Sequence, residues 1–153
     1  MTKSLKKAET KSAPAATATG NSKGTRASPW VLKTPSQQSE FLAFRDESLD
    51  PPALVVQVGK TELRFQLRCL EDLASMLKAH GDWMALGNAD EQKPVADGTI
   101  EAWARSPTNP VGGWYGLKKG LRGRFGNYVP PVMEVLGLAE VEHNAKNNRM
   151  RAK

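Results

Sequence analysis

Apolar and polar positions between residues 39 and 67 follow patterns that predict three β-strands. Residues 39–46 contain a short apolar run, residues 53–58 are rich in Leu and Val, and residues 61–67 alternate apolar and polar side chains. Only Gly59 and Lys60 separate the last two strands. Because glycine accepts a positive φ at the first position of a two-residue loop, this spacing predicts a β-hairpin with a type II′ turn.

A helix is predicted directly after these strands. Leu70, Leu73, Ala74 and Leu77 recur at the spacing of one helical face, and Gly81 is placed to end the helix in the left-handed conformation. The helix is expected to lie across the three-stranded sheet with its polar residues outward. Residues 29–97 are therefore interpreted as a βββα unit and a connecting loop.

Two further helices and a hairpin are predicted in the last third of the chain. A short helix follows Ile100 and ends before Pro107, since the residue before proline avoids the helical conformation. Residues 127–136 predict a second helix, which has two prolines in its first turn and ends at Gly137.

Charge complementarity predicts the register of the C-terminal hairpin. A turn at residues 144–147 places Glu142 opposite Arg149 and Glu140 opposite Arg151. The same register directs the apolar pair between them, Val141 and Met150, toward the core. Each complementary cross-strand pair contributes a few tenths of a kcal/mol or more and so favours this register.

Residues 112–126 combine six glycines, four cations and three aromatic residues without an acid. If residues 113–124 are helical, four of the glycines share a face. Three interior glycines cost a helix roughly 3 kcal/mol relative to alanine, so another contact must compensate. Either a second backbone packs against the glycines or a phosphate binds there, and the pattern leaves both readings open.

Two resemblances follow from these patterns. The succession of helices and a two-stranded hairpin in residues 98–153 resembles a winged-helix domain. The stretches 112–125 and 136–144 are similar to a family of small bacterial proteins of unknown function, a likeness that spans most of residues 29–153 and implies no activity. The expected fold class is α+β, with a three-stranded antiparallel sheet and one helix packed on a winged-helix-like unit.

The net charge of +6 is unevenly distributed along the chain. Residues 1–28 carry +5, residues 29–113 carry −4 and residues 114–153 carry +5. The first 28 residues also contain almost nothing to bury, so they are expected to remain a disordered basic tail. Basic ends around an acidic middle favour binding of a polyanion.

Candidate chemistry is sparse. The lone Cys69 has apolar neighbours and is expected to be a buried thiol, and neither His80 nor His143 has further ligands at metal-binding spacing. These observations predict no catalytic residues, no cofactor, no metal and no small-molecule substrate. The sequence lacks an apolar run of 18 residues and a secretory signal, so a cytoplasmic protein without membrane contact is expected.

The leading prediction is a non-catalytic nucleic-acid-associated protein that binds mainly through phosphate contacts. The helix over 127–136 has no Arg or Lys, so little sequence specificity is expected. The alternative is a protein–protein adaptor that uses the winged-helix-like unit and the acidic middle region. The residues predicted to contact nucleic acid are Lys118, Lys119, Arg122, Arg124, Asn127, Lys146 and Arg149.

Overall fold

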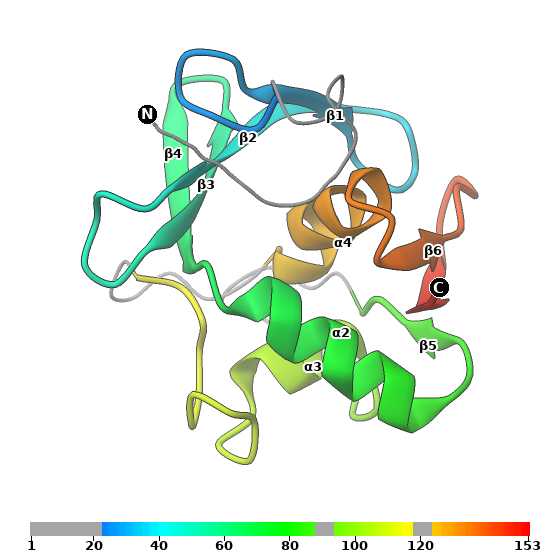
Figure 1. Cartoon of the computed structure of the whole chain (residues 1–153). Coiled ribbons are helices and arrows are strands. Elements are labelled where there is room, and N and C mark those ends of the chain that lie inside the picture. Colours follow the sequence, from blue (N-terminus) through cyan, green and yellow to red (C-terminus); the bar gives the residue numbers. More distant parts are fainter. Residues whose placement is uncertain (1–22, 88–93, 118–123) are drawn as a thin grey trace.

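A computed structural model describes residues 23–87, 94–117 and 124–153. The first sheet forms the upper layer of the molecule in Figure 1, and the helices lie beneath it. Its strands, β1 (Trp30–Lys33), β2 (Glu40–Asp46), β3 (Ala53–Val58) and β4 (Thr61–Gln66), are antiparallel in the order β1-β2-β3-β4. The α+β class is confirmed, but the sheet has four strands where the sequence predicted three.

The additional strand, β1, lies at the sheet edge next to residues that were predicted to be disordered. Trp30 is buried and pairs with Ala43 of β2. Residues 24–28 form hydrogen-bonded turns, and the N–H of Arg45 donates to the carbonyl of Gly24 over 2.9 Å. Residues 24–28, which the prediction placed in the tail, thus form backbone hydrogen bonds with one another and with β2. The remainder of the predicted tail, 1–22, lies outside the described residues.

The β3–β4 hairpin has the predicted turn. Val58 pairs with Thr61, and of the two loop residues only Gly59 has a positive φ, at 59°. A type II′ turn requires this combination, since its second central residue keeps a negative φ. The prediction from the Gly-Lys spacing is confirmed.

The predicted helix after the sheet is α2 (Cys69–His80). It buries its leucine face, and its last turn ends at Gly81, which has a φ of 75° and donates its N–H to the carbonyl of Leu77 over 3.0 Å. Cys69 is fully buried, as predicted, and this burial raises the pKa of its thiol.

A second, three-stranded sheet contains β5 (Met84–Ala85), β6 (Ala139–Val141) and β7 (Arg149–Ala152) in the order β5-β7-β6. Glu140 pairs with Arg151 and Val141 with Met150, which confirms the predicted register. The side chain of Asn148 braces the turn through hydrogen bonds of 2.6 and 2.9 Å to the backbone of Asn144. Strand β5 was not predicted, because two residues are too short to produce a pattern.

In the described part of the chain, α2 is followed by helices α3 (Ile100–Arg105) and α4 (Phe125–Val135). Helix α4 lies between the two sheets (Figure 1), and eight of its eleven residues are buried. One continuous apolar cluster includes side chains from both sheets and from α2, α3 and α4. The βββα segment and the C-terminal segment therefore share a single core.

The glycine-rich segment is not helical over residues 113–117. It runs antiparallel beside β4, where Gly116 bridges to Phe65 and the N–H of Leu117 donates to the carbonyl of Arg64 over 2.8 Å. Strand β4 has an open edge that supplies backbone partners, so the glycine-rich chain satisfies its polar groups there. The helix predicted over 113–124 is wrong in this part, and residues 118–123 lie outside the described residues.

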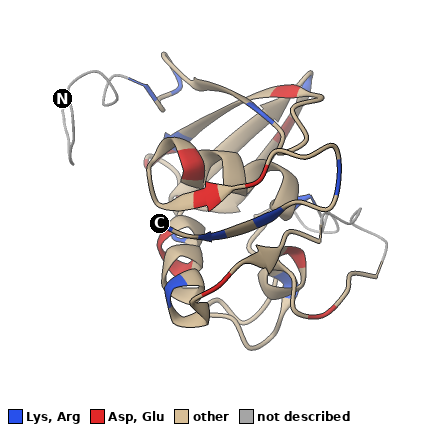
Figure 2. Cartoon of the chain, turned by 90° about the vertical axis from the view of Figure 1, so that its right-hand side faces the viewer, with Lys and Arg blue, Asp and Glu red and all other residues tan. Residues whose placement is uncertain are grey.

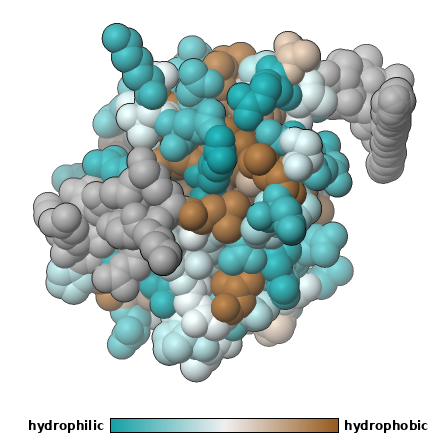
Figure 3. Space-filling model, turned by 90° about the vertical axis from the view of Figure 1, so that its left-hand side faces the viewer, coloured by the Kyte–Doolittle hydropathy of each residue, from teal (hydrophilic) through white to brown (hydrophobic). Residues whose placement is uncertain are grey.

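The same segment adds apolar surface to the outer face of the first sheet. Leu117 and Leu49 pack against a small buried cluster of Phe44, Ala53 and Val55. Figure 3 views the molecule from the β4 side and shows apolar side chains gathered at the centre of that face among hydrophilic ones. The segment also contacts α2, because the hydroxyl of Tyr115 donates a hydrogen bond to Asp72 over 2.9 Å.

A histidine links the β1–β2 loop to the second sheet. The Nε2 of His143 lies 2.6 Å from Glu134, and its Nδ1 lies 2.9 Å from both the carbonyl of Pro35 and the amide of Gln37. Partial burial lowers the pKa of His143, but the contacts with Glu134 and Pro35 outweigh it, so the net pKa is raised. The protonated ring can donate to both oxygen acceptors at once.

Replacement of His143 with glutamine should destabilise the fold in a pH-dependent way. Because the folded-state pKa is raised, the stabilisation is complete below about pH 6.5 and is lost as the pH rises through the folded-state value. His143 is partly exposed, so the unfolding free energies of wild type and His143→Gln should differ by less than about 1 kcal/mol at about pH 5.5. Urea unfolding at about pH 5.5 and 8.5 measures this difference. His80→Gln serves as the control. If the difference in unfolding free energy between wild type and His143→Gln grows as the pH rises, the proposed role of protonated His143 is wrong.

Candidate interaction site

The residues predicted to contact nucleic acid fall into three groups. Lys118, Lys119 and Arg122 lie outside the described residues. Arg124 and Asn127 stand at the start of α4, where the N–H of Asn127 donates to the carbonyl of Arg124 over 3.0 Å. Lys146 and Arg149 belong to the β6–β7 hairpin, with Lys146 exposed in its turn.

The arginines of β7 are neutralised within the molecule. Arg149 contacts Glu142 through two hydrogen bonds of 3.0 and 2.7 Å, and Arg151 contacts Glu140 at 2.5 Å. Both guanidinium groups also lie over the ring of Trp83, at 5.2 and 4.5 Å from its centroid. The hydrogen bonds between Arg149 and Glu142 raise the pKa of Arg149 and lower that of Glu142. Of these two arginines, Arg149 was predicted to contact phosphate, and its charge is paired with Glu142 within the hairpin.

The described part of the molecule is nearly neutral. It carries fourteen Lys or Arg residues against thirteen Asp or Glu residues, so most of the net charge of +6 resides in segments 1–22 and 118–123. Figure 2 shows positive and negative segments interspersed over the face that includes β7. The described fold therefore does not gather its cations into one basic patch on this face.

Helix α4 uses its surface for internal packing. Tyr128 stacks edge-on against Phe41 of β2, with ring centroids 5.0 Å apart, and other buried residues of α4 face the common core. Asn127 is only partly exposed, and the polar residue near the other end of the helix, Glu134, is bound to His143. This helix presents little polar surface that could read base edges.

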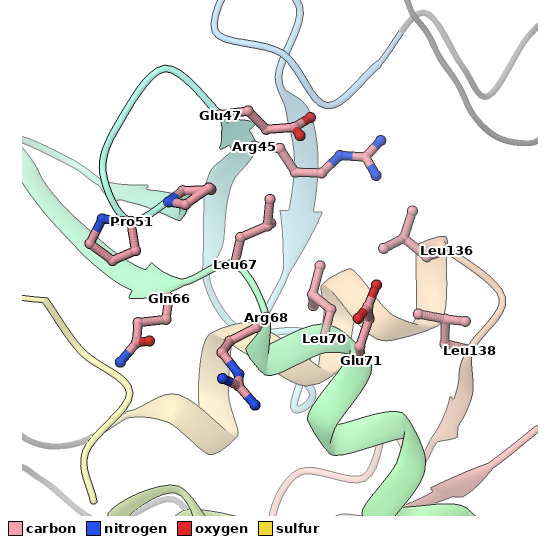
Figure 4. A pocket seen from close by; sticks show the side chains of 11 residues that line it. Arg45, Glu47, Pro51, Gln66, Leu67, Arg68, Leu70, Glu71, Leu136 and Leu138 are labelled. Atoms are coloured by element: carbon pink, nitrogen blue, oxygen red, sulfur yellow. The ribbon is translucent and has the colours of Figure 1, made fainter. Parts of the chain in front are cut away.

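An open pocket lies where the first sheet meets α2 and the end of α4 (Figure 4). Its volume is about 650 Å³. Four leucines from three segments form the apolar part of its wall, together with Pro51 and Pro52 of the β2–β3 loop. The leucines are Leu67, Leu70, Leu136 and Leu138. Leu138 is 38% exposed, so the apolar wall continues to the molecular surface.

Charged side chains surround this apolar wall. Arg45 and Glu47 come from the end of β2, and Arg68 and Glu71 from the start of α2 (Figure 4). Arg68 is bound to Asp72 at 2.8 Å. Arg45 instead lies over the ring of Trp30, 5.3 Å from its centroid. An apolar wall with a few polar groups at its edge is the usual composition of a binding pocket.

The family described as "Family of unknown function (DUF6855)" matches residues 22–153. The chain belongs to this family. Its description assigns no activity, and neither the curated proteins nor the solved structures contain a match to this chain.

Within the described parts of this DUF6855 chain, no helix is long and apolar enough to cross a membrane. The same residues contain no group of three or more His, Cys, Asp or Glu side chains arranged to hold a metal ion. The pocket has no signature in the sequence, because its residues are separated by up to 93 positions and only the fold brings Arg45 near Leu138. Two weak features of the sequence coincide with the pocket. One is the Pro51-Pro52 pair, and the other is the leucines on either side of Gly137 and at the start of α2.

Proposed function

We propose that this protein is a non-catalytic protein–protein interaction module and that its binding site is the pocket between the first sheet, α2 and the end of α4. The observation that carries this proposal is the open apolar wall of Leu67, Leu70, Leu136 and Leu138 with charged groups at its edge. A concave apolar surface with a few polar groups at its edge is the usual composition of a binding site. The alternative predicted from the sequence is thereby favoured over nucleic-acid binding.

The order of the elements supports a winged-helix-like unit in residues 69–153. Helix α2, strand β5, helices α3 and α4 and the β6–β7 hairpin follow the winged-helix order, with α2 in place of the helix predicted over 113–124. In helix-turn-helix proteins the second helix enters the major groove. Here the corresponding helix, α4, packs against β2 and carries no Arg or Lys. Because α4 is buried, the unit is better suited to contact another protein than to enter a DNA groove.

An affinity experiment tests the proposal. The tagged full-length chain should recover a partner protein in stoichiometric amount from cells of its source. Leu138→Asp places a charge in the pocket wall at an exposed position and should weaken that association about tenfold or more. Val31→Asp changes an apolar residue that is 59% exposed on β1, outside the pocket, and should retain the partner. Equal recovery by both variants would exclude the pocket as the site.

A second candidate function is nucleic-acid association through phosphate contacts. It is favoured by the concentration of positive charge in segments 1–22 and 118–123, outside the nearly neutral described fold. Binding of random duplex or single-stranded DNA should then fall steeply with salt. Alanine replacement of Lys118, Lys119, Arg122 and Arg124 should flatten the log–log slope. Strong salt-dependent binding together with no partner protein would reverse the preference between the two functions.

A further inference from the structure

The guanidinium group of Arg45 differs from the neighbouring arginines of the first sheet and α2. Arg26 is bound to Asp46 at 3.2 Å, Arg64 to Glu62 at 2.8 Å and Arg68 to Asp72 at 2.8 Å. Among the described residues, Arg45 forms no ion pair or side-chain hydrogen bond, and its contact is the face of Trp30. It is therefore the arginine in the pocket wall whose N–H donors are available to a ligand.

The surroundings of Arg45 favour an anionic partner. Arg45 is exposed at the edge of the pocket, and partial desolvation of its guanidinium lowers its pKa. Glu47 on the same wall opposes the shift through its charge without forming an ion pair. A partly dehydrated guanidinium gains charge-assisted hydrogen bonds from a carboxylate, which can accept two parallel N–H donors.

The apolar wall lies beside this cation. Figure 4 shows Arg45 at the top of the pocket, Leu67 and Leu70 below it, and Leu136 and Leu138, at the end of α4, on the adjoining side. Because Leu138 carries the wall out to the surface, the site is an open groove. A small ligand usually has most of its surface enclosed, so an open groove of this kind suits a segment of a larger molecule.

We infer that the groove binds a short peptide segment of a protein partner in which apolar side chains cover the four leucines and a carboxylate contacts Arg45. This inference rests on the proposed function and adds the chemistry of the partner to it. Glu47 and Glu71, which also lie at the groove, disfavour a segment with several acids. The preferred segment therefore carries one carboxylate, from an Asp or Glu side chain or from a chain terminus, next to two or more large apolar residues.

Selection from a library of random twelve-residue peptides displayed on phage tests the inference with the full-length chain. The enriched peptides should combine an apolar pair with one acid close to it in the peptide sequence. Synthetic copies labelled with a fluorophore then give dissociation constants by anisotropy. Changing the acid of the peptide to its amide should weaken binding about tenfold, as should Arg45→Gln in the protein. Arg64→Gln, on a different face of the sheet, should leave the affinity unchanged.

A charge reversal sharpens the test. Arg45→Glu should favour peptides in which Lys replaces the acid, provided that circular dichroism shows the same fold. Peptides with free and amidated C-termini separate a terminal carboxylate from a side-chain carboxylate. Octanoate serves as a competitor, and tighter binding of octanoate than of every peptide would overturn the inference in favour of a small carboxylate ligand.

The outcomes separate this inference from the proposed function. Peptides that require Leu138 but bind Arg45→Gln and wild type equally would overturn the role of Arg45 and leave the interaction module intact. If no peptide binds the wild type, or if bound peptides are insensitive to Leu138→Asp and Arg45→Gln alike, the groove is not a peptide site. In that case, a natural partner still recovered by Leu138→Asp would also refute the proposed function.

Discussion

Replacement of Glu101 with alanine is expected to lower the free energy of unfolding by about 3 kcal/mol. Glu101 is fully buried in α3, and its carboxylate accepts hydrogen bonds from the N–H groups of Phe125 and Gly126 at 3.3 and 2.9 Å. The residue before α4, Arg124, has a φ of 63° and makes no side-chain cap. Glu101 therefore supplies from another helix the acceptors that a capping residue normally provides.

The electrostatic setting of Glu101 explains why the loss should be large. Burial raises the pKa of its carboxyl group, and the N–H donors of α4 together with Arg105, 3.5 Å away, offset part of this cost. Removal of the carboxylate leaves buried N–H groups without their acceptor and takes a negative charge away from Arg105. Unsatisfied buried donors and broken buried ion pairs are among the costliest single changes in a protein.

Urea unfolding of wild type, Glu101→Ala and Glu101→Gln measures the effect. Glutamine keeps the shape and one acceptor oxygen, so its cost should be smaller than that of alanine. Glu40→Ala, at an exposed position of β2, is the matched control and should remain within about 0.5 kcal/mol of wild type. A cost below about 1 kcal/mol for Glu101→Ala would show that water satisfies the start of α4.

Replacement of Phe125 with alanine should be at least as destabilising, by about 3 to 5 kcal/mol. Its ring is fully buried and lies 5.6 Å from that of Phe65, 5.8 Å from that of Tyr115 and 6.1 Å from that of Trp103. These neighbours come from β4, from the extended segment beside it and from α3. Phe125 thus joins three parts of the chain, and its removal leaves a cavity that fixed backbones cannot readily close.

Thermal and urea unfolding test this expectation. Phe125→Leu retains part of the volume and should cost less than Phe125→Ala. Val31→Ala, which truncates an exposed apolar side chain, provides the control and should have little effect. If the unfolding free energy of Phe125→Ala lies within about 1 kcal/mol of the wild-type value, the surrounding aromatic residues must pack independently of the Phe125 ring.

Local patterns predicted a substantial part of this fold. The Gly59-Lys60 turn, the leucine face of α2 with its end at Gly81 and the register of the β6–β7 hairpin are all confirmed. Each depends on residues a few positions apart or on facing pairs in one hairpin. The steric freedom of glycine and the attraction of opposite charges act at that range, so the sequence expresses them directly.

Other features depended on contacts between distant segments. Residues 113–117 have glycine spacing that is compatible with a helix face, but the open edge of β4 offered hydrogen-bond partners and the segment became extended. Strand β1 is short, and its pairing with β2 rather than its pattern defines it. The candidate site shows the same dependence, since Arg149, one of the residues predicted to contact phosphate, is bound to Glu142 in the pairing that the sequence had itself predicted.

By itself, the sequence determined the secondary-structure elements whose signals are local, the burial of Cys69 and the segregation of positive charge along the chain. The tertiary structure decided the fourth strand, the capping of α4 by Glu101 and the groove that joins Arg45 to Leu138. The physical reason is the separation along the sequence between the residues that interact. Backbone conformation and neighbouring charges are encoded within a few residues, whereas hydrogen-bond partners at sheet edges and the walls of a pocket exist only after distant segments have packed together.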